Sequence, residues 1–306
     1  MSYNNSEFKT FDGTPITLYH WNTETPKAIV LITHGMSEHA ARYNNFAEFL
    51  NSKNILVIAS DLRGHGKTAG SIENVGHFAT VDGWKKVVKD IITIAEDIKK
   101  EHPKLPLILL GHSMGSFILR AVAFNKPSIG NAYIFSSTAG HPGLKGVAGE
   151  QVAKANMKLF GKRNRSKFLT NLAFGDYNKK YENARTIKDW LSKDEKIVDD
   201  YIADPYCMQI FSSQFYCDML HGLLEVNNIH HIRKMDKNKA VLLFAGDMDP
   251  VGNYGEGPTE VYNKMKEVGI ENIELKIYKN GRHEMLNEIN KDEVYNMIIS
   301  WINKQV

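Results

Sequence analysis

Residues 105–125 read LPLILLGHSMGSFILRAVAFN and carry the sharpest signal in the chain. The apolar run at 105–110 predicts a buried strand, and the apolar spacing at 117–125 predicts a helix. Gly-His-Ser-Met-Gly stands between them at 111–115. A Gly-x-Ser-x-Gly sequence between a strand and a helix is typical of a tight turn that presents its serine at the end of a sheet. Ser113 is therefore a candidate nucleophile, and an ordinary glycine-rich turn is the alternative.

The rest of the chain repeats this alternation of strands and helices. A hairpin is expected at 7–20, strands at 28–33, 55–59, 132–136, 240–245 and 273–278, and helices at 43–50, 82–101 and 293–303. Strands that alternate with helices form right-handed crossovers and a mainly parallel sheet. The sequence predicts an α/β fold whose mostly parallel eight-stranded sheet is flanked by helices.

The alternation breaks between residues 140 and 236, where no strong strand run occurs. We interpret 140–236 as a helical cap inserted between two parts of one core, 1–139 and 237–306. Within it, Ser192-Lys193-Asp194-Glu195 has the pattern of a capping box, in which the serine begins a helix. That helix should end near Asp204-Pro205, because the residue before proline disfavours helix.

A serine hydroxyl needs a neighbouring base to become nucleophilic. In chains with this type of turn the order is serine, acid, histidine. His283 lies in NGRHEML, directly after the strand predicted at 273–278, and is the candidate base. The acid should follow the preceding strand, in GDMDPV, where Asp247 and Asp249 both qualify. We favour Asp249, with Asp247 as a structural residue of the turn.

An oxyanion hole requires two backbone N–H groups near the nucleophile. Met114 follows the serine and Met36 lies in the loop after the strand at 28–33, so these two are the candidate donors. His34 and His112 stand beside these positions. We expect His34 to pack beneath its loop and His112 to point away from the substrate, both in structural roles.

DLRGHGKT at 61–68 superficially resembles a phosphate-binding loop. It lacks the first glycine of GxxxxGK[ST], so the nucleotide-binding interpretation is disfavoured. A structural role is expected instead, with Asp61 and Arg63 bonding neighbouring loops.

Two features of the insertion bear on the substrate. Residues 152–174 place apolar side chains around four basic residues, Lys162, Arg163, Arg165 and Lys167. The cluster is either a contact for a lipid surface or anionic head group, or a solvated loop between helices. The apolar stretch that contains Phe211, Phe215 and Met219 either lines an acyl-chain pocket or forms the core of the insertion.

The composition excludes several classes of protein. The formal net charge is +3, from 38 basic and 35 acidic residues, which is too weak for nucleic-acid binding. The two cysteines, Cys207 and Cys217, have no zinc-type spacing and are expected to be reduced thiols, with a single bridge between them as the alternative. The first residues lack the pattern of a secretory signal, and no run of 18 apolar residues occurs. A cytoplasmic protein is expected.

Five segments together resemble a known family: HGMSEHAARY at 34–43, DLRGHGKT at 61–68, GHSMGS at 111–116, GDMDPVG at 246–252 and NGRHEML at 280–286. They are similar to the monoacylglycerol lipase and lysophospholipase group of α/β-hydrolases. The resemblance implies the catalytic residues Ser113, Asp249 and His283, and the oxyanion donors Met36 and Met114.

The resemblance also implies hydrolysis of a lipid-like monoester through an acyl-enzyme, without a metal or an organic cofactor. Three alternatives stay open on the same scaffold. They are a short-chain or aryl esterase, an aminopeptidase, and a ligand receptor without catalysis.

Overall fold

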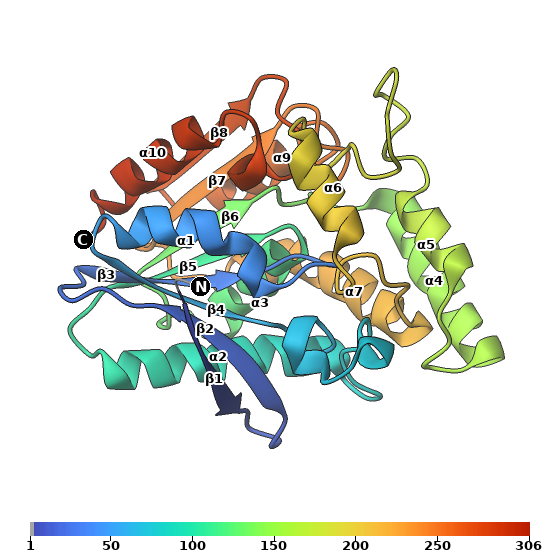
Figure 1. Ribbon diagram of the computed structural model, residues 1–306, viewed down its shortest axis with the longest axis horizontal. Helices are drawn as coiled ribbons and strands as arrows, with labels where there is room; N and C mark the ends of the chain where they lie inside the picture. Colours follow the sequence, from blue (N-terminus) through green and yellow to red (C-terminus); the bar gives the residue numbers. More distant parts are fainter. Residues whose placement is uncertain (1–2) are drawn as a thin grey trace.

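The computed structural model describes residues 3–306, and an eight-stranded sheet crosses it in the order β1-β2-β4-β3-β5-β6-β7-β8 (Figure 1). The strands are β1 (Asn4–Lys9), β2 (Pro15–Trp21), β3 (Ala28–Thr33), β4 (Ile55–Ser60), β5 (Leu107–His112), β6 (Ala132–Ser136), β7 (Ala240–Gly246) and β8 (Ile273–Tyr278). Within this sheet, the pairings of β2 with β1 and with β4 are antiparallel, and the pairings of the other neighbouring strands are parallel. The predicted α/β class and mostly parallel eight-stranded sheet are confirmed.

Ten α-helices occur within residues 3–306. They are α1 (Asn44–Asn51), α2 (Gly83–Glu101), α3 (Met114–Asn125), α4 (Gly143–Phe160), α5 (Lys167–Phe174), α6 (Glu195–Ala203), α7 (Ser213–Val226), α8 (Ile229–Ile232), α9 (Glu256–Glu267) and α10 (Lys291–Ile302). In this part of the chain, none combines the length and the apolar character needed to cross a bilayer.

The two faces of the sheet are covered by different helices, because neighbouring strand residues point to opposite sides. On β5, Leu107 and Leu109 pack with α2, α3 and α9, whereas Ile108 and Leu110 pack with α1 and α10. All four side chains are fully buried. A sheet that is covered on both faces explains why its central strands are continuous apolar runs.

Helices α4 to α8 all lie between β6 and β7 in the chain, and α4, α5, α6 and α7 gather on one side of the molecule (Figure 1). Helix α7 joins this group to the core, since a Cβ at Gly222 would lie 2.3 Å from the Trp84 ring of α2. The Trp84 indole also donates a hydrogen bond to Glu225 at 2.7 Å. The domain boundaries at 140 and 236 stay a prediction.

The prediction that Ser192 caps the next helix is wrong. Asp194 is the N-cap of α6, and its carboxylate accepts hydrogen bonds from the backbone N–H groups of Lys196 and Ile197. The Ser192 hydroxyl instead donates to the Asn287 carbonyl at 3.0 Å. The helix ends before Asp204-Pro205, as predicted.

Candidate active site

Ser113 occupies a strained turn between β5 and α3. Its φ of 52° and ψ of −122° place a non-glycine residue in a region that side chains disfavour. The turn closes only because glycines flank the serine. A Cβ at Gly115 would lie 2.0 Å from the Thr33 carbonyl oxygen, and one at Gly111 would lie 2.5 Å from the Gly115 carbonyl oxygen. This strand–turn–helix geometry is that of a nucleophile elbow.

An acid–base pair comes from the loops after β7 and β8. His283 Nδ1 lies 2.9 Å from Asp249 Oδ1, and the same carboxylate oxygen accepts the Val251 N–H at 2.9 Å. Asp249 is completely buried. Asp247 instead accepts the Asn280 N–H at 2.6 Å, which holds the turn. Of the two aspartates that the sequence left open, Asp249 is the one that pairs with the histidine.

The environment of His283 favours its protonated form. Burial by itself would lower the pKa of His283, but the negative charge and hydrogen bond of Asp249 outweigh burial and raise that pKa. Asp249 is therefore placed to stabilise a positive charge on the His283 ring.

Ser113 and His283 line the same cavity, which has a volume of about 210 Å³ and is also lined by Met36 and Met114. The loop after β3 lies against Ser113, since a Cβ at Gly35 would be 3.1 Å from the Ser113 Cβ. Within the described residues, the Met36 N–H has no hydrogen-bond partner. Met114 begins α3, where the first N–H groups lack intrahelical acceptors. Both groups suit an oxyanion hole.

The family model of Hydrolase_4, described as serine aminopeptidase, S33, matches residues 24–290. The chain belongs to this family. Monoacylglycerol lipase of Mycolicibacterium smegmatis is 28% identical over 301 residues, which cover 96% of this chain and 95% of that protein. Monoglyceride lipase of Homo sapiens is 26% identical over 299 residues, which cover 96% of this chain and 88% of that protein.

A solved structure agrees with this assignment. The highly thermostable carboxyl esterase from Bacillus coagulans, solved in complex with glycerol, aligns with a TM-score of 0.92 and 28% identity over 100% of both chains. The fold and the family together make this protein a serine hydrolase with an α/β-hydrolase fold.

The two histidines beside the hydrolase site differ in their placement. His34 is fully buried, accepts the Leu62 N–H at Nε2 (2.9 Å) and lies 2.7 Å from the Gly35 carbonyl through Nδ1. Burial lowers its pKa to about 3, so His34 stays neutral beneath the loop, as predicted. His112 hydrogen-bonds Ser136, but its ring centroid lies 4.7 Å from that of His283. The prediction that His112 points away from the site is wrong.

The residues of the DLRGHGKT segment hold neighbouring loops together, as predicted. The Asp61 carboxylate accepts hydrogen bonds from the Ala40 and Lys67 N–H groups at 2.8 and 2.7 Å. Arg63 forms ion pairs with Asp12 and Asp90. The segment therefore supports the loop that carries Met36 and does not contact the cavity.

The sequence analysis missed a buried ion cluster that joins two loops of the site. Glu38 accepts the Gly35 N–H at 2.5 Å, and Arg42 bonds Glu38 at 2.9 Å. Arg42 also forms a bidentate pair with Glu284, both distances being 2.7 Å. Burial by itself would raise the pKa of Glu284, but Arg42 overcomes it and lowers that pKa to about 2. Charged residues inside the HGMSEHAARY and NGRHEML segments were the available signal.

The structure separates the three predicted substrate contacts. Met219 lines the cavity, together with Tyr216, Leu220 and Leu223 of α7. Phe211 and Phe215 do not line it, and their fully buried rings stack on each other with centroids 4.4 Å apart. Placing Phe211 and Phe215 in the substrate pocket is therefore wrong, because they form the core between the insertion and the sheet.

The basic cluster is divided in a similar way. Arg165 donates to the carbonyls of Ile210 and Glu73, and Lys162 donates to the Thr80 carbonyl at 2.8 Å. These two side chains tie the loop between α4 and α5 to the body of the hydrolase. Arg163 and Lys167 are exposed.

Proposed function

We propose that this hydrolase cleaves lipid-like monoesters, such as monoacylglycerols, through an acyl-enzyme on Ser113. The observation that carries the proposal is the cavity above Ser113, whose walls are mainly apolar side chains of α3, α5 and α7, including Phe117, Phe174 and Leu220. Such walls suit an acyl chain. The names of the relatives, monoacylglycerol lipase and monoglyceride lipase, point to the same substrate class.

The proposed reaction has two halves. Ser113 Oγ attacks the ester carbonyl while His283 accepts the hydroxyl proton, and Asp249 stabilises the resulting imidazolium. The N–H groups of Met36 and Met114 stabilise the oxyanion. The C–O bond then breaks, and the alcohol leaves with the proton from His283. Water, deprotonated by His283, attacks the acyl-enzyme and releases the carboxylate and the free Ser113.

The chain-length profile tests this substrate class. With nitrophenyl esters of increasing length, kcat/KM should peak at a medium or long acyl chain, and 1-monoacylglycerol should be hydrolysed. A peak at acetate would indicate a short-chain esterase, and cleavage of aminoacyl anilides instead of esters would indicate a peptidase. Absence of fluorophosphonate labelling at Ser113 in the folded protein would favour the third alternative, a ligand receptor without catalysis.

One side chain favours lysophospholipids as a second substrate. Lys188 lines the cavity and forms no ion pair shorter than 4.0 Å within residues 3–306, and the nearby Glu284 carboxylate acts on its ammonium group only at longer range. The ammonium lies over the rings of Trp190 and Tyr201, at 5.8 and 5.3 Å from their centroids. Burial lowers the pKa of Lys188, which means that the charged ammonium is poorly solvated. A bound anion would stabilise that positive charge. The phosphate of a lysophospholipid supplies that charge.

A matched pair of substrates tests Lys188. Lys188→Met should lower kcat/KM for a lysophospholipid with a phosphate monoester by about tenfold, because about 1.5 kcal/mol of charge-assisted bonding is lost. Hydrolysis of monoacylglycerol of the same acyl chain should change little. Equal effects on both substrates would remove the argument for the anionic one.

We propose further that residues 140–236 form a cap and that its α4–α5 surface contacts membranes. Seven of its large apolar side chains are exposed: Leu144, Val147, Val152, Leu159, Phe160, Phe168 and Leu172. Leu159 and Phe160 are 76% and 65% exposed, so insertion into lipid would remove unfavourable contact with water. The basic side chains nearby suit anionic head groups, and α5 borders the cavity through Phe174.

Vesicle co-sedimentation tests the membrane contact. The protein should bind phosphatidylglycerol-containing vesicles more strongly than phosphatidylcholine ones, and Leu159→Ser with Phe160→Ser should weaken both. Ile187→Ser, which removes an exposed apolar side chain outside α4 and α5, is the control. Unchanged binding in the double variant would contradict the proposal.

The free, buried thiols Cys207 and Cys217 support the expectation of a cytoplasmic location.

A further inference from the structure

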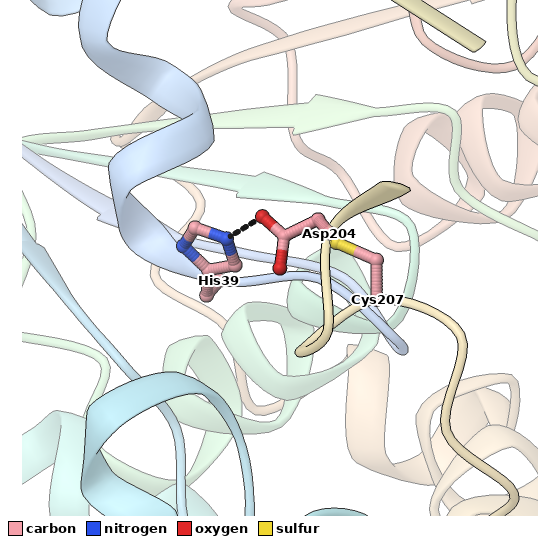
Figure 2. Close-up of side chains that lie close together, drawn as sticks. All are labelled: His39, Asp204 and Cys207. Carbon is pink, nitrogen blue, oxygen red and sulfur yellow. Dashed lines mark hydrogen bonds and ion pairs between the residues drawn. The ribbon is translucent and has the colours of Figure 1, made fainter. Parts of the chain in front are cut away.

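A cluster of three metal-ligating side chains, His39, Asp204 and Cys207, lies outside the hydrolytic site (Figure 2). An imidazole nitrogen, a carboxylate oxygen and the thiol sulfur all lie within 4.8 Å of one another. His39 Nε2 and Asp204 Oδ2 are 2.8 Å apart. None of the three lines the cavity above Ser113. The cluster is therefore a separate feature of the molecule.

We propose that His39, Asp204 and Cys207 bind a zinc ion, with water as the fourth ligand. Zinc accepts nitrogen, sulfur and oxygen donors in a tetrahedron, whereas magnesium and calcium prefer oxygen alone. Bond lengths of about 2.0 to 2.3 Å set neighbouring donors about 3.3 to 3.7 Å apart. The donor atoms of the three side chains now lie between 2.8 Å and at most 4.8 Å apart, so this range falls within their present separations. Small side-chain movements would complete the site. The thiol proton passes to solvent as the sulfur binds.

The surroundings of the cluster support this assignment. The other carboxylate oxygen of Asp204 accepts the Tyr206 N–H at 2.8 Å, which fixes the ligand and leaves Oδ2 directed at His39. The His39 and Asp204 side chains are 13% and 25% exposed, whereas Cys207 is fully buried. An ion would therefore enter from the solvent-exposed side, where His39 and Asp204 lie, and would bind the buried Cys207 sulfur at the inner end of the site.

The site joins two segments that are far apart in the sequence. His39 ends the loop that carries Met36, whereas Asp204 and Cys207 follow α6 of the insertion. The Ser37 hydroxyl already donates to the Cys207 carbonyl, so the two segments are in contact without the ion. Zinc would cross-link them and should raise the melting temperature of the protein, because it binds the folded chain preferentially.

Cobalt(II) is the direct probe, because it occupies zinc sites and absorbs in the near ultraviolet when a thiolate binds it. Addition of cobalt to the purified, chelator-treated protein should produce this band with a stoichiometry of one, and zinc should displace it. The band should vanish in Cys207→Ser and persist in Cys217→Ser, which removes the other buried thiol. His39→Gln and Asp204→Asn should weaken zinc binding by about tenfold or more, measured by calorimetry.

Absence of the band in the wild-type protein would overturn the proposal, as would zinc binding that is unchanged in all three ligand variants. Circular dichroism of each variant shows whether it folds. His39→Gln keeps a donor for Asp204 and provides a folded variant if the other two fail. Because binding is read from absorbance and heat, the result does not depend on which ester the hydrolase cleaves.

Discussion

At the scale of single residues, Ser113 is the serine at the tight turn between β5 and α3. Ser113→Ala should reduce kcat by about 10⁴-fold or more while leaving the melting temperature nearly unchanged, because the reaction loses its nucleophile. Turnover of a nitrophenyl ester and thermal unfolding measure the two effects. Activity of the variant within tenfold of wild type would place the nucleophile elsewhere.

The two aspartates after β7 form a natural comparison. Asp249→Asn should lower kcat by about 10⁴-fold, since the amide no longer stabilises the imidazolium or fixes its tautomer. Asp247→Asn should change kcat only a few-fold, because Asp247 accepts a backbone N–H from Asn280. Steady-state kinetics of both variants on one substrate decides between them, and the reverse order would exchange their roles.

The pH dependence of catalysis follows from the raised pKa of His283. The base must be neutral, so kcat/KM should fall as the pH drops through a pKa above the ordinary histidine value of 6.5. In Asp249→Asn the charge that raises the pKa is gone while burial remains, so this acid limb should move to lower pH. A limb at the same pH in both proteins would mean that another group controls it.

At the scale of elements, the site depends on two loops that Arg42 joins. Glu284→Gln should lower the free energy of unfolding by about 3 to 5 kcal/mol, because it leaves the buried Arg42 short of a charged partner. The same variant should lower kcat, since Glu284 is the neighbour of the base. Urea unfolding and ester hydrolysis test this, with Glu274→Gln, which changes an exposed glutamate on β8, as the control.

The same pair gives the stability a pH dependence. The pKa of Glu284 is lowered from 4.5 to about 2, so its stabilising contribution is complete above 4.5 and is lost as the pH falls toward 2. Wild-type stability should therefore decline more steeply over this range than that of Glu284→Gln. Parallel curves for the two proteins would contradict this linkage.

Elements were predictable wherever local sequence determines them. The β5–α3 turn needs Gly111 and Gly115, and chain order points to the loops after β7 and β8, so the placement of Ser113, Asp249 and His283 followed from motif and order. Helical spacing, in contrast, does not say which face of α7 meets a cavity. Phe215 and Met219 share one apolar stretch, yet of these two only Met219 lines the cavity. Arg42 and Glu284 pair across 242 residues, and the charged residues of their two segments do not by themselves say which partners meet.

At the scale of the whole molecule, the inserted helices and the sheet meet around a buried arginine. Arg120 of α3 is 1% exposed and donates to the carbonyls of Ala139 and Val226 at 2.9 and 2.7 Å. It also donates to Asn227 Oδ1 at 2.8 Å. Burial lowers the pKa of Arg120 to about 9, since its acceptors are neutral. One side chain thus links the helix after the nucleophile to both ends of the inserted segment.

Arg120→Met should therefore weaken the attachment of the insertion as well as the core. The methionine fills much of the space but removes the donor of four acceptors, which are the three above and the Thr138 hydroxyl oxygen. The free energy of unfolding should therefore fall by about 2 to 4 kcal/mol. Arg120→Lys should recover only part of this loss, because an ammonium cannot reproduce the planar set of donors. Limited proteolysis should cut the variant first within 140–236, whereas Arg233→Met, which changes an exposed side chain, should behave as wild type. If cleavage of Arg120→Met follows global unfolding alone, the arginine stabilises the molecule without holding the insertion in place.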